Sequence, residues 1–141
     1  SDLRVVVGPV VSDLVGASMS AREAMSGHRA AAAWPEGPAV LSAADLLPER
    51  ALAGDGHARR TLTRDVYAPL EAAGGDLLAT CASFLDHGAS VEASARALFV
   101  HANTVRYRLK RIQDVTTYSP SDARDAYVLR LAITLGRLAA R

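Results

Sequence analysis

The stretch that decides the fold is Ser90-Val-Glu-Ala-Ser-Ala-Arg-Ala-Leu-Phe-Val-His-Ala-Asn-Thr-Val-Arg-Tyr-Arg-Leu-Lys-Arg-Ile112. It predicts two short helices joined by a tight connection. Ser90 is a suitable N-cap, and Glu92 places a negative charge in the first turn, where the helix dipole favours it. Apolar residues recur at i, i+4 and i+7 in each helix, which gives each one an apolar face. The two sets are Val91, Ala95 and Leu98, then Val105, Leu109 and Ile112.

The second predicted helix, residues 102–114, carries most of the charge of this stretch. Residues 101–112 contain four basic side chains and no acid. On an ideal helix the side opposite the apolar face carries Asn103, Arg106, Tyr107 and Lys110, and one flank carries Thr104, Arg108 and Arg111. Two short helices with such a second member are typical of the helix-turn-helix, whose second helix enters the DNA major groove. A solvated basic face on an ordinary core helix gives the same periodicity, so the pattern alone leaves both interpretations open.

The order of residues favours the first interpretation. Residues 95–109 run Ala-Arg-Ala-Leu-Phe-Val-His-Ala-Asn-Thr-Val-Arg-Tyr-Arg-Leu. This order closely resembles the helix-turn-helix of the PucR/CdaR-like bacterial transcriptional regulators, with its pattern A-x-x-L-x-V-H-R-N-T-V-x-Y-R-L. The resemblance covers roughly residues 69–139. Ala102, Cys81 and Thr117 stand where that family usually has Arg, Leu and Gly, and the change at 102 removes one candidate contact to DNA at the start of the recognition helix.

The first third of the chain predicts a small α/β unit. Residues 3–7 and 39–41 are short β-branched or aliphatic strands, and Ser20-Ala-Arg-Glu23 has the pattern of a capping box that opens a helix. In the PucR/CdaR-like proteins the preceding region resembles a degenerate nucleotide-cyclase-like (GGDEF-like) domain, and residues 1–47 resemble its C-terminal end. Since the chain starts with Ser1 and enters a strand almost at once, we expect it to be the C-terminal part of a longer regulator.

The predicted fold class is mainly α, with a helix-turn-helix DNA-binding domain after a small partial strand-helix-strand unit. The predicted domains are residues 1–47 (partial α/β unit), 48–70 (helical linker) and 71–141 (DNA-binding domain). Pro69-Leu70 and Gly74-Gly75 mark the boundary before the last of these. Within that domain, 76–87 predicts a scaffold helix, 113–119 a polar connection, and Ser119 or Ser121 a cap for the last helix. The apolar stripe of the last helix is wide enough to cover the core and still leave surface for a second subunit.

Composition excludes several other classes of function. Half of the residues are hydrophobic but only 5% are aromatic, and the net charge is +1, so the useful electrostatic signal is the local cluster at 101–112. A single cysteine excludes an internal disulfide and agrees with a reducing cytoplasm. No spacing of His or Cys predicts a metal site, no glycine loop predicts a nucleotide site, and no serine lies in a nucleophile elbow. We therefore predict no enzyme, no cofactor, no metal and no membrane association.

The leading functional prediction is a cytoplasmic DNA-binding transcriptional regulator that acts as a homodimer on double-stranded DNA. Asn103, Arg106, Tyr107 and Lys110 are expected to face base edges, because the side opposite the core goes deepest into the groove. Phosphate contacts are expected from Thr104, Arg108 and Arg111, and also from Ser90 and His101. For His101 a structural role and a phosphate contact are equally compatible with the sequence. By resemblance, a small metabolite, such as a purine breakdown product or a sugar diacid, would be sensed by a domain outside this chain.

Two alternatives remain open at this point. The helices could form a dimerisation or regulatory interaction module whose basic face contacts another protein instead of DNA. The domain could also be of the Fis-like DNA-binding type, which has an Asn-Thr pair in its recognition helix as well.

Overall fold

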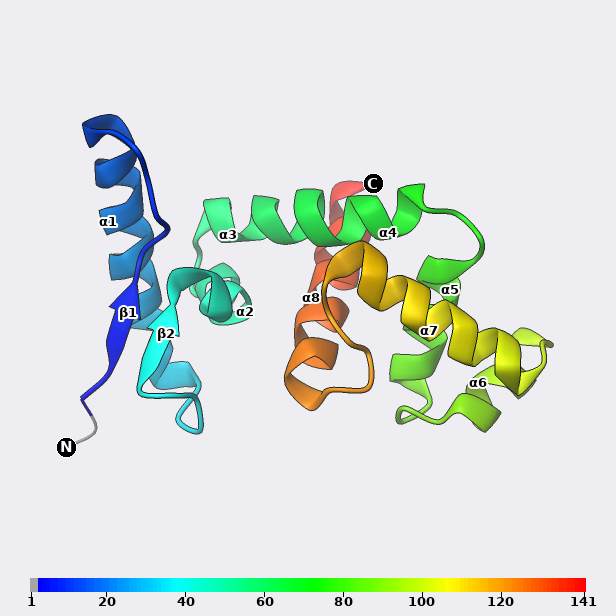
Figure 1. The fold of residues 1–141 in the computed structure, drawn as a ribbon. Coiled ribbons are helices and arrows are strands. Elements are labelled where there is room, and N and C mark those ends of the chain that lie inside the picture. Colours follow the sequence, from blue (N-terminus) through cyan, green and yellow to red (C-terminus); the bar gives the residue numbers. More distant parts are fainter. Residues whose placement is uncertain (1–2) are drawn as a thin grey trace. The chain divides into compact units, whose positions relative to one another are not determined.

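Two short strands, β1 (Val5–Val7) and β2 (Val40–Ser42), pair in parallel near the start of the chain in the computed structural model, which describes residues 3–141 (Figure 1). Val6 pairs with Leu41 in the sheet. Leu41 forms a small core with Ala31 and Leu46, and Val6 and Trp34 pack against this core. The other side of the pair is exposed at Val5, Val7 and Val40. Both predicted strands are therefore confirmed, with bounds that differ by one or two residues.

The first helix, α1 (Leu14–Ala30), begins earlier than the predicted capping box. Asp13 is its N-cap, because its carboxylate accepts a hydrogen bond of 2.7 Å from the backbone amide of Gly16. Ser20 lies inside the helix, where its hydroxyl donates to the carbonyl of Pro9 at 2.7 Å. The prediction that Ser20 caps the helix is wrong, since Asp13 caps it two turns upstream. Glu23, the other member of the predicted capping box, contacts Arg50 and His57 instead. A short 3-10 turn, η1 (Ala31–Ala33), follows the helix.

After β2 the chain enters η2 (Ala43–Leu46) and then α2 (Leu47–Leu52), which packs on α1. The predicted helix start at residues 42–45 is confirmed as a capping box. The Ser42 hydroxyl accepts from the Asp45 amide at 3.2 Å, and the Asp45 carboxylate accepts from the Ser42 amide at 2.8 Å.

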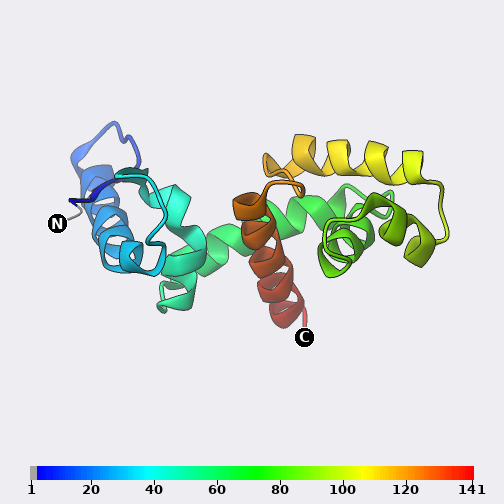
Figure 2. The same ribbon diagram turned by 90° about the horizontal axis from the view of Figure 1, so that it is seen from below.

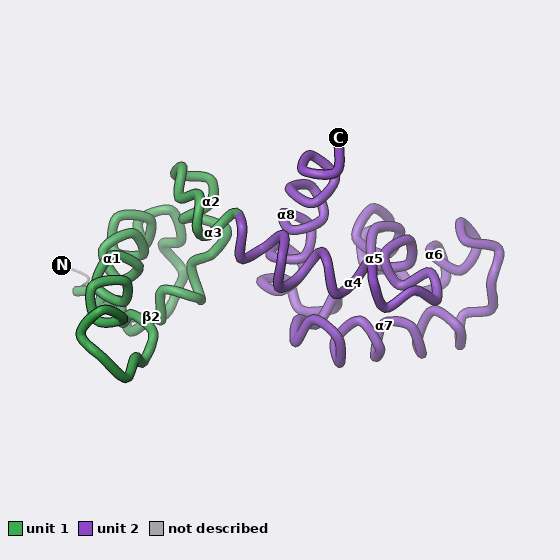
Figure 3. The backbone as a smooth tube through the Cα atoms, turned by 90° about the horizontal axis from the view of Figure 1, so that it is seen from above, with its two compact units in different colours: residues 1–59 green, residues 60–141 purple. Residues whose placement is uncertain are grey.

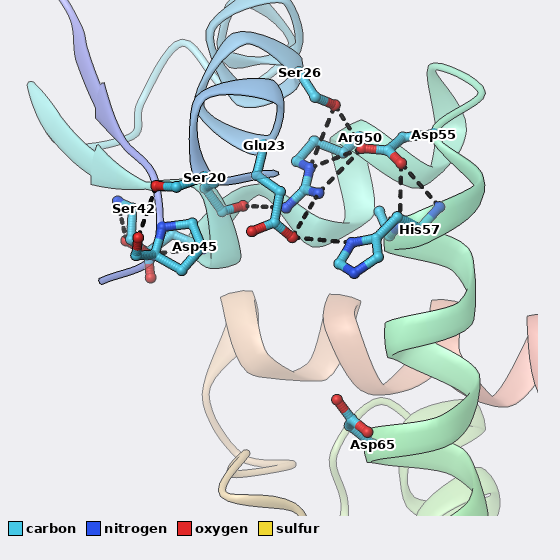
Figure 4. A network of polar contacts seen from close by, with 12 residues as sticks. Ser20, Glu23, Ser26, Ser42, Asp45, Arg50, Asp55, His57 and Asp65 are labelled. Atoms are coloured by element: carbon cyan, nitrogen blue, oxygen red, sulfur yellow. Dashed lines mark hydrogen bonds and ion pairs between the residues drawn. The ribbon is translucent and has the colours of Figure 1, made fainter. Parts of the chain in front are cut away.

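A buried arginine ties α1 to α2 (Figure 4). Arg50 is only 1% exposed, and its Nε donates to Asp55 Oδ2 at 3.1 Å. Its Nη2 lies 3.1 Å from the same oxygen and 3.6 Å from Glu23 Oε1, while the Ser26 hydroxyl donates to Asp55 at 2.6 Å. Glu23 also lies 2.9 Å from the Nδ1 of His57. The guanidinium is therefore the centre of a polar network in the interior of the N-terminal third.

The Asp55 carboxylate makes this network sensitive to acid. Burial alone would raise its pKa, but hydrogen bonds from Ser26, the Ala58 amide and Arg50, with the charge of Arg50, lower the pKa from 3.8 to about 2. A folded-state pKa below the unfolded one means that the stabilisation is complete above about pH 4 and is lost as the pH falls toward 2.

We expect the difference in unfolding free energy between the parent and Asp55→Asn to shrink as the pH falls from about 4 toward 2. Urea unfolding followed by the emission of Trp34, the only tryptophan, measures it; a pH-independent difference would contradict the assignment.

The next helical run is continuous but changes its winding. It consists of α3 (Gly56–Thr61), the π-helical segment η3 (Leu62–Tyr67) and α4 (Ala68–Ala72). Its buried apolar residues recur every four positions: Ala58, Leu62, Val66 and Leu70. In an α-helix that spacing drifts by about 40° per repeat, and the wider turns of η3 absorb the drift.

Pro69 lies inside this helical run and does not end it. Proline in a helix interior removes a hydrogen bond and clashes with the preceding turn. Here the widened segment comes just before it, and the amide of Ala68 donates to the carbonyl of Thr63, five residues back. The helix continues to Ala72, and the break comes at Gly74 and Gly75, which both have positive φ.

The C-terminal part is built from four more helices: α5 (Leu77–Asp86), α6 (Val91–Leu98), α7 (Ala102–Thr116) and α8 (Ala123–Ala139). The predicted scaffold helix at 76–87 is confirmed as α5. The predicted cap of the last helix is wrong: Asp122 caps α8 by accepting from the Asp125 amide at 2.9 Å, and Pro120 is buried ahead of the helix. Residues 115 and 116, predicted only as connection, continue α7.

Helix α8 packs closely on η3. Its Gly136 is buried against the ring of Tyr67, and a Cβ at position 136 would overlap that ring. The buried face of α8 therefore follows Val128, Leu129, Ala132, Ile133 and Gly136, while Leu138, which was placed on the predicted stripe, is 58% exposed.

The chain divides into two compact units, residues 1–59 (unit 1) and residues 60–141 (unit 2), shown in Figure 3. The predicted linker 48–70 is shared between them, with α2 in unit 1 and α4 in unit 2. The predicted domain limits at residues 47 and 70 stay predictions. Across residues 3–141, every helix is too short or too polar to cross a membrane.

Candidate nucleic-acid interface

Helices α6 and α7 form the predicted helix-turn-helix. They are separated by residues 99–101 alone, and α7 begins at Ala102, the position predicted to open the recognition helix. The whole stretch from Val91 to Thr116 contains helix and turn and no strand. Because α7 runs to Thr116, it is two residues longer than predicted.

Local interactions fix both ends of α6. The Ser90 hydroxyl accepts from the Ala93 amide at 3.1 Å, and the buried Ser94 hydroxyl donates to the Ser90 carbonyl at 2.7 Å. At the other end the amide of Val100 donates to Ala95 and that of Phe99 to Arg96, the hydrogen bonds of a Schellman motif. Phe99 has φ 57° and is 94% exposed, although glycine is the usual residue in this conformation. The turn is thus set by backbone hydrogen bonds and not by a glycine.

His101 caps the recognition helix. Its Nδ1 accepts a hydrogen bond of 3.0 Å from the amide of Asn103, and its carbonyl accepts from Thr104 at 2.9 Å. Since Nδ1 is the acceptor, the ring proton of neutral His101 is on Nε2. The Nε2–H donor is therefore not used by the cap. The sequence left a structural role and a phosphate contact open; the structure assigns the structural one and leaves Nε2–H available for the other.

One side of α7 packs on α5 and α6. In Figure 2 both helices lie on the same side of α7, drawn in yellow. Val105 and Ile112 are fully buried there, and Thr116 is 3% exposed. Leu109, predicted as the centre of the apolar face, is only half-buried. The buried line is rotated slightly from the predicted one, toward Arg108.

The opposite side of α7 is exposed, and we call it the recognition face. Its members are Asn103, Arg106, Tyr107, Lys110 and Arg111, all of them predicted to contact DNA. Tyr107 is 67% exposed, which leaves its ring and hydroxyl available to a partner. Thr104, in the first turn of α7, and Ser90, the N-cap of α6, are half-buried.

Arg108 does not belong to this face. Only 17% of its side chain is exposed, its Nη1 donates to the Thr80 hydroxyl at 3.3 Å, and its Nη2 lies 3.7 Å from Asp76 Oδ2. Thr80 is fully buried on α5. The phosphate contact of Arg108 stays a prediction, and in this structure the side chain fastens α7 to α5.

Arg106 has partners that sequence reasoning did not anticipate. Its Nη1 donates to Asn103 Oδ1 at 2.9 Å, and its Nη2 lies 3.4 Å from Glu92 Oε1, on α6. The Asn103 contact spans one helical turn and could be expected from the i, i+3 spacing. The Glu92 contact joins residues fourteen positions apart, and only the angle between α6 and α7 produces it. Glu92 was identified in the sequence solely as a favourable first-turn charge.

The remaining candidates for a site are metal ligands and the single cysteine. Within residues 3–141, His, Cys, Asp and Glu side chains do not come together in a group of three that could hold a metal ion. Cys81 is buried on α5, and burial raises the pKa of its thiol to about 12, so the neutral thiol is the form present at neutral pH.

Known proteins resemble this chain at the level of a family model, of curated relatives and of a solved structure. Residues 77–135 match the PucR C-terminal helix-turn-helix domain family. Uncharacterized proteins of Mycobacterium bovis and Mycobacterium tuberculosis are each 52% identical over 138 residues. These matches cover 98% of this chain and 33% of each relative, so the chain spans about a third of their length.

A solved structure is also similar over nearly the whole chain. It is the regulator of polyketide synthase expression from Bifidobacterium adolescentis, which is 44% identical and superposes with a TM-score of 0.87. The likeness covers 96% of this chain and 54% of the other. A regulator of polyketide synthase expression thus has the same order and shape of these elements.

Proposed function

We propose that the chain is the DNA-binding part of a transcriptional regulator and places α7 in the major groove, since residues 77–135 match the PucR C-terminal helix-turn-helix domain family. The observation that carries this proposal is the recognition face. It begins directly after the turn, is exposed, and carries cationic side chains on a helix whose other side is buried. A face of this charge and width suits the major groove, which admits one α-helix.

The side chains divide into two groups. Asn103, Arg106, Tyr107 and Lys110 face base edges and give sequence specificity, because they lie farthest from the buried line of α7. Arg111, Thr104, Ser90 and His101 contact phosphates at the margins. The cap at His101 supports the last of these, because it leaves Nε2–H as an outward donor.

We further propose that the protein acts as a homodimer in the cytoplasm and responds to a small effector sensed outside this chain. One recognition helix covers only a few base pairs, so two copies on a near-palindromic site account better for tight binding. Exposed apolar groups on α8, such as Leu138, offer surface to a second copy. The resemblance of residues 1–47 to the end of a GGDEF-like domain remains a prediction.

An electrophoretic shift with random duplex DNA over a series of salt concentrations tests the DNA-binding proposal. We expect affinity that falls steeply with salt, together with enrichment of a preferred site after repeated selection. Absence of binding at low salt would instead favour the interaction module, in which the recognition face contacts a protein. Footprinting of the selected site tests the dimer: a single short site bound tightly by monomer would contradict it.

Arg106→Ala and Arg111→Ala are expected to weaken binding in different ways. Arg106→Ala should cost about 1–3 kcal/mol on the preferred site and relax specificity at one base pair. Arg111→Ala should weaken specific and non-specific binding about equally and reduce the salt slope by about one unit. Titration of both variants against selected and scrambled duplexes measures this. Arg64→Ala, which removes an exposed arginine paired with Asp65 on η3, is the matched control; equal effects of all three changes would contradict the assignment.

A further inference from the structure

Arg106 is held on two sides before any DNA is present. Asn103 Oδ1 accepts from its Nη1 at 2.9 Å, and Glu92 Oε1 lies 3.4 Å from its Nη2. The two partners come from different helices, so the guanidinium is tied across the turn between α6 and α7. One carboxylate therefore lies beside a face that is otherwise polar and basic.

This ion pair has little effect on stability, because the side chains are 55% and 64% exposed. A carboxylate near the phosphates also opposes DNA binding through its charge. Its main consequence is geometric. A free arginine samples many rotamers, whereas a guanidinium with a partner at each Nη keeps its plane and its remaining N–H donors in one direction.

The donors of Arg106 indicate which base it can recognise. An asparagine that reads adenine must accept from N6 with its oxygen and donate to N7 with its amide nitrogen. Here Arg106 occupies one of the two lone pairs of the Asn103 oxygen and is held beside it. Arg106 itself presents only donors. Its remaining N–H groups match the two acceptors of guanine, O6 and N7.

We propose that Glu92 is a positioning residue for DNA recognition: through Arg106 and Asn103 it sets the start of α7 to read guanine. This inference rests on the proposed DNA-binding function. It adds a specificity-determining residue outside the recognition helix.

The test measures base discrimination and not affinity alone. The probes are the duplex selected from random DNA by the parent chain and its single-base variants at each position. Glu92→Ala should reduce discrimination at one G·C pair by about tenfold and raise affinity for scrambled duplex, because a negative charge is lost. Glu92→Gln keeps an acceptor for Nη2 and should retain most of the discrimination. Glu71→Ala removes a carboxylate on α4, outside the Arg106 contacts, and serves as the charge control.

The outcomes separate this inference from the function on which it rests. If the parent binds no DNA, the proposed function fails. If the parent selects a site and Glu92→Ala keeps full discrimination at every position, only the positioning role is overturned. A selected site whose Arg106-dependent position is adenine overturns the guanine assignment. Arg106→Ala with Glu92→Ala should discriminate no worse than Arg106→Ala alone, and additive losses would show that Glu92 acts independently. Circular dichroism of each variant checks that the helices remain.

Discussion

Arg50→Met is expected to lower the free energy of unfolding of unit 1 by about 3–5 kcal/mol, as when one partner of a buried ion pair is removed. Arg50 is 1% exposed and donates to the Ala43 carbonyl at 3.0 Å as well as to Asp55 at 3.1 Å. Methionine keeps much of the volume, so the loss reports on charge and hydrogen bonding. Glu23 and Asp55 would lose the cation that lies between α1 and α2.

Urea unfolding followed by Trp34 emission measures this effect in the right place, because Trp34 packs on the core of unit 1. Arg22→Met is the matched control in the same unit. Arg22 is exposed on α1, so its loss should cost at most about 0.5 kcal/mol. If Arg50→Met is as mild as the control, the network in Figure 4 does not hold the two helices together.

Ile112→Ala is expected to destabilise unit 2 by about 2–5 kcal/mol, the usual cost of truncating a fully buried aliphatic side chain. Ile112 is 0% exposed on the side of α7 that packs on α5 and α6. The smaller side chain leaves a cavity beneath the recognition helix. Thermal unfolding followed by circular dichroism at 222 nm, about the helix minimum, measures the change, since helix content dominates this unit.

Leu109→Ala provides the comparison on the same helix. Because Leu109 is half-buried, its truncation should cost clearly less than that of Ile112. A larger cost for Leu109 than for Ile112 would mean that α7 is rotated and that the recognition face is assigned to the wrong side.

The sequence predicted the helix-turn-helix well because its signals are local. Ser90 and Glu92 mark a helix start, and apolar spacing within each helix identifies the buried side to within one residue position. Position 117 is a further local signal. The resembled family usually has glycine there, and glycine favours a positive φ. Thr117 keeps this backbone conformation, with φ 67°, at the end of α7.

The features that the sequence did not predict are contacts between distant residues and choices between nearby caps. Arg108 lies on the flank by helix angle, and only the position of Thr80, twenty-eight residues earlier, turns it inward. Glu92 and Arg106 meet only because of the crossing of two helices. At both ends of the chain an aspartate, Asp13 or Asp122, caps where a serine was expected. Serine and aspartate are near-equal caps, so sequence alone ranks them poorly.

The close approach of Gly136 to the Tyr67 ring has a consequence for the evolution of these proteins. With no volume for a Cβ at position 136, the two positions cannot change independently. A relative with alanine at 136 must compensate, most simply by replacing the aromatic ring at 67 with a smaller side chain. The pair should therefore covary across an alignment, although the residues lie far apart in sequence. Relatives that keep the tyrosine beside a larger residue at 136 must pack α8 differently on η3.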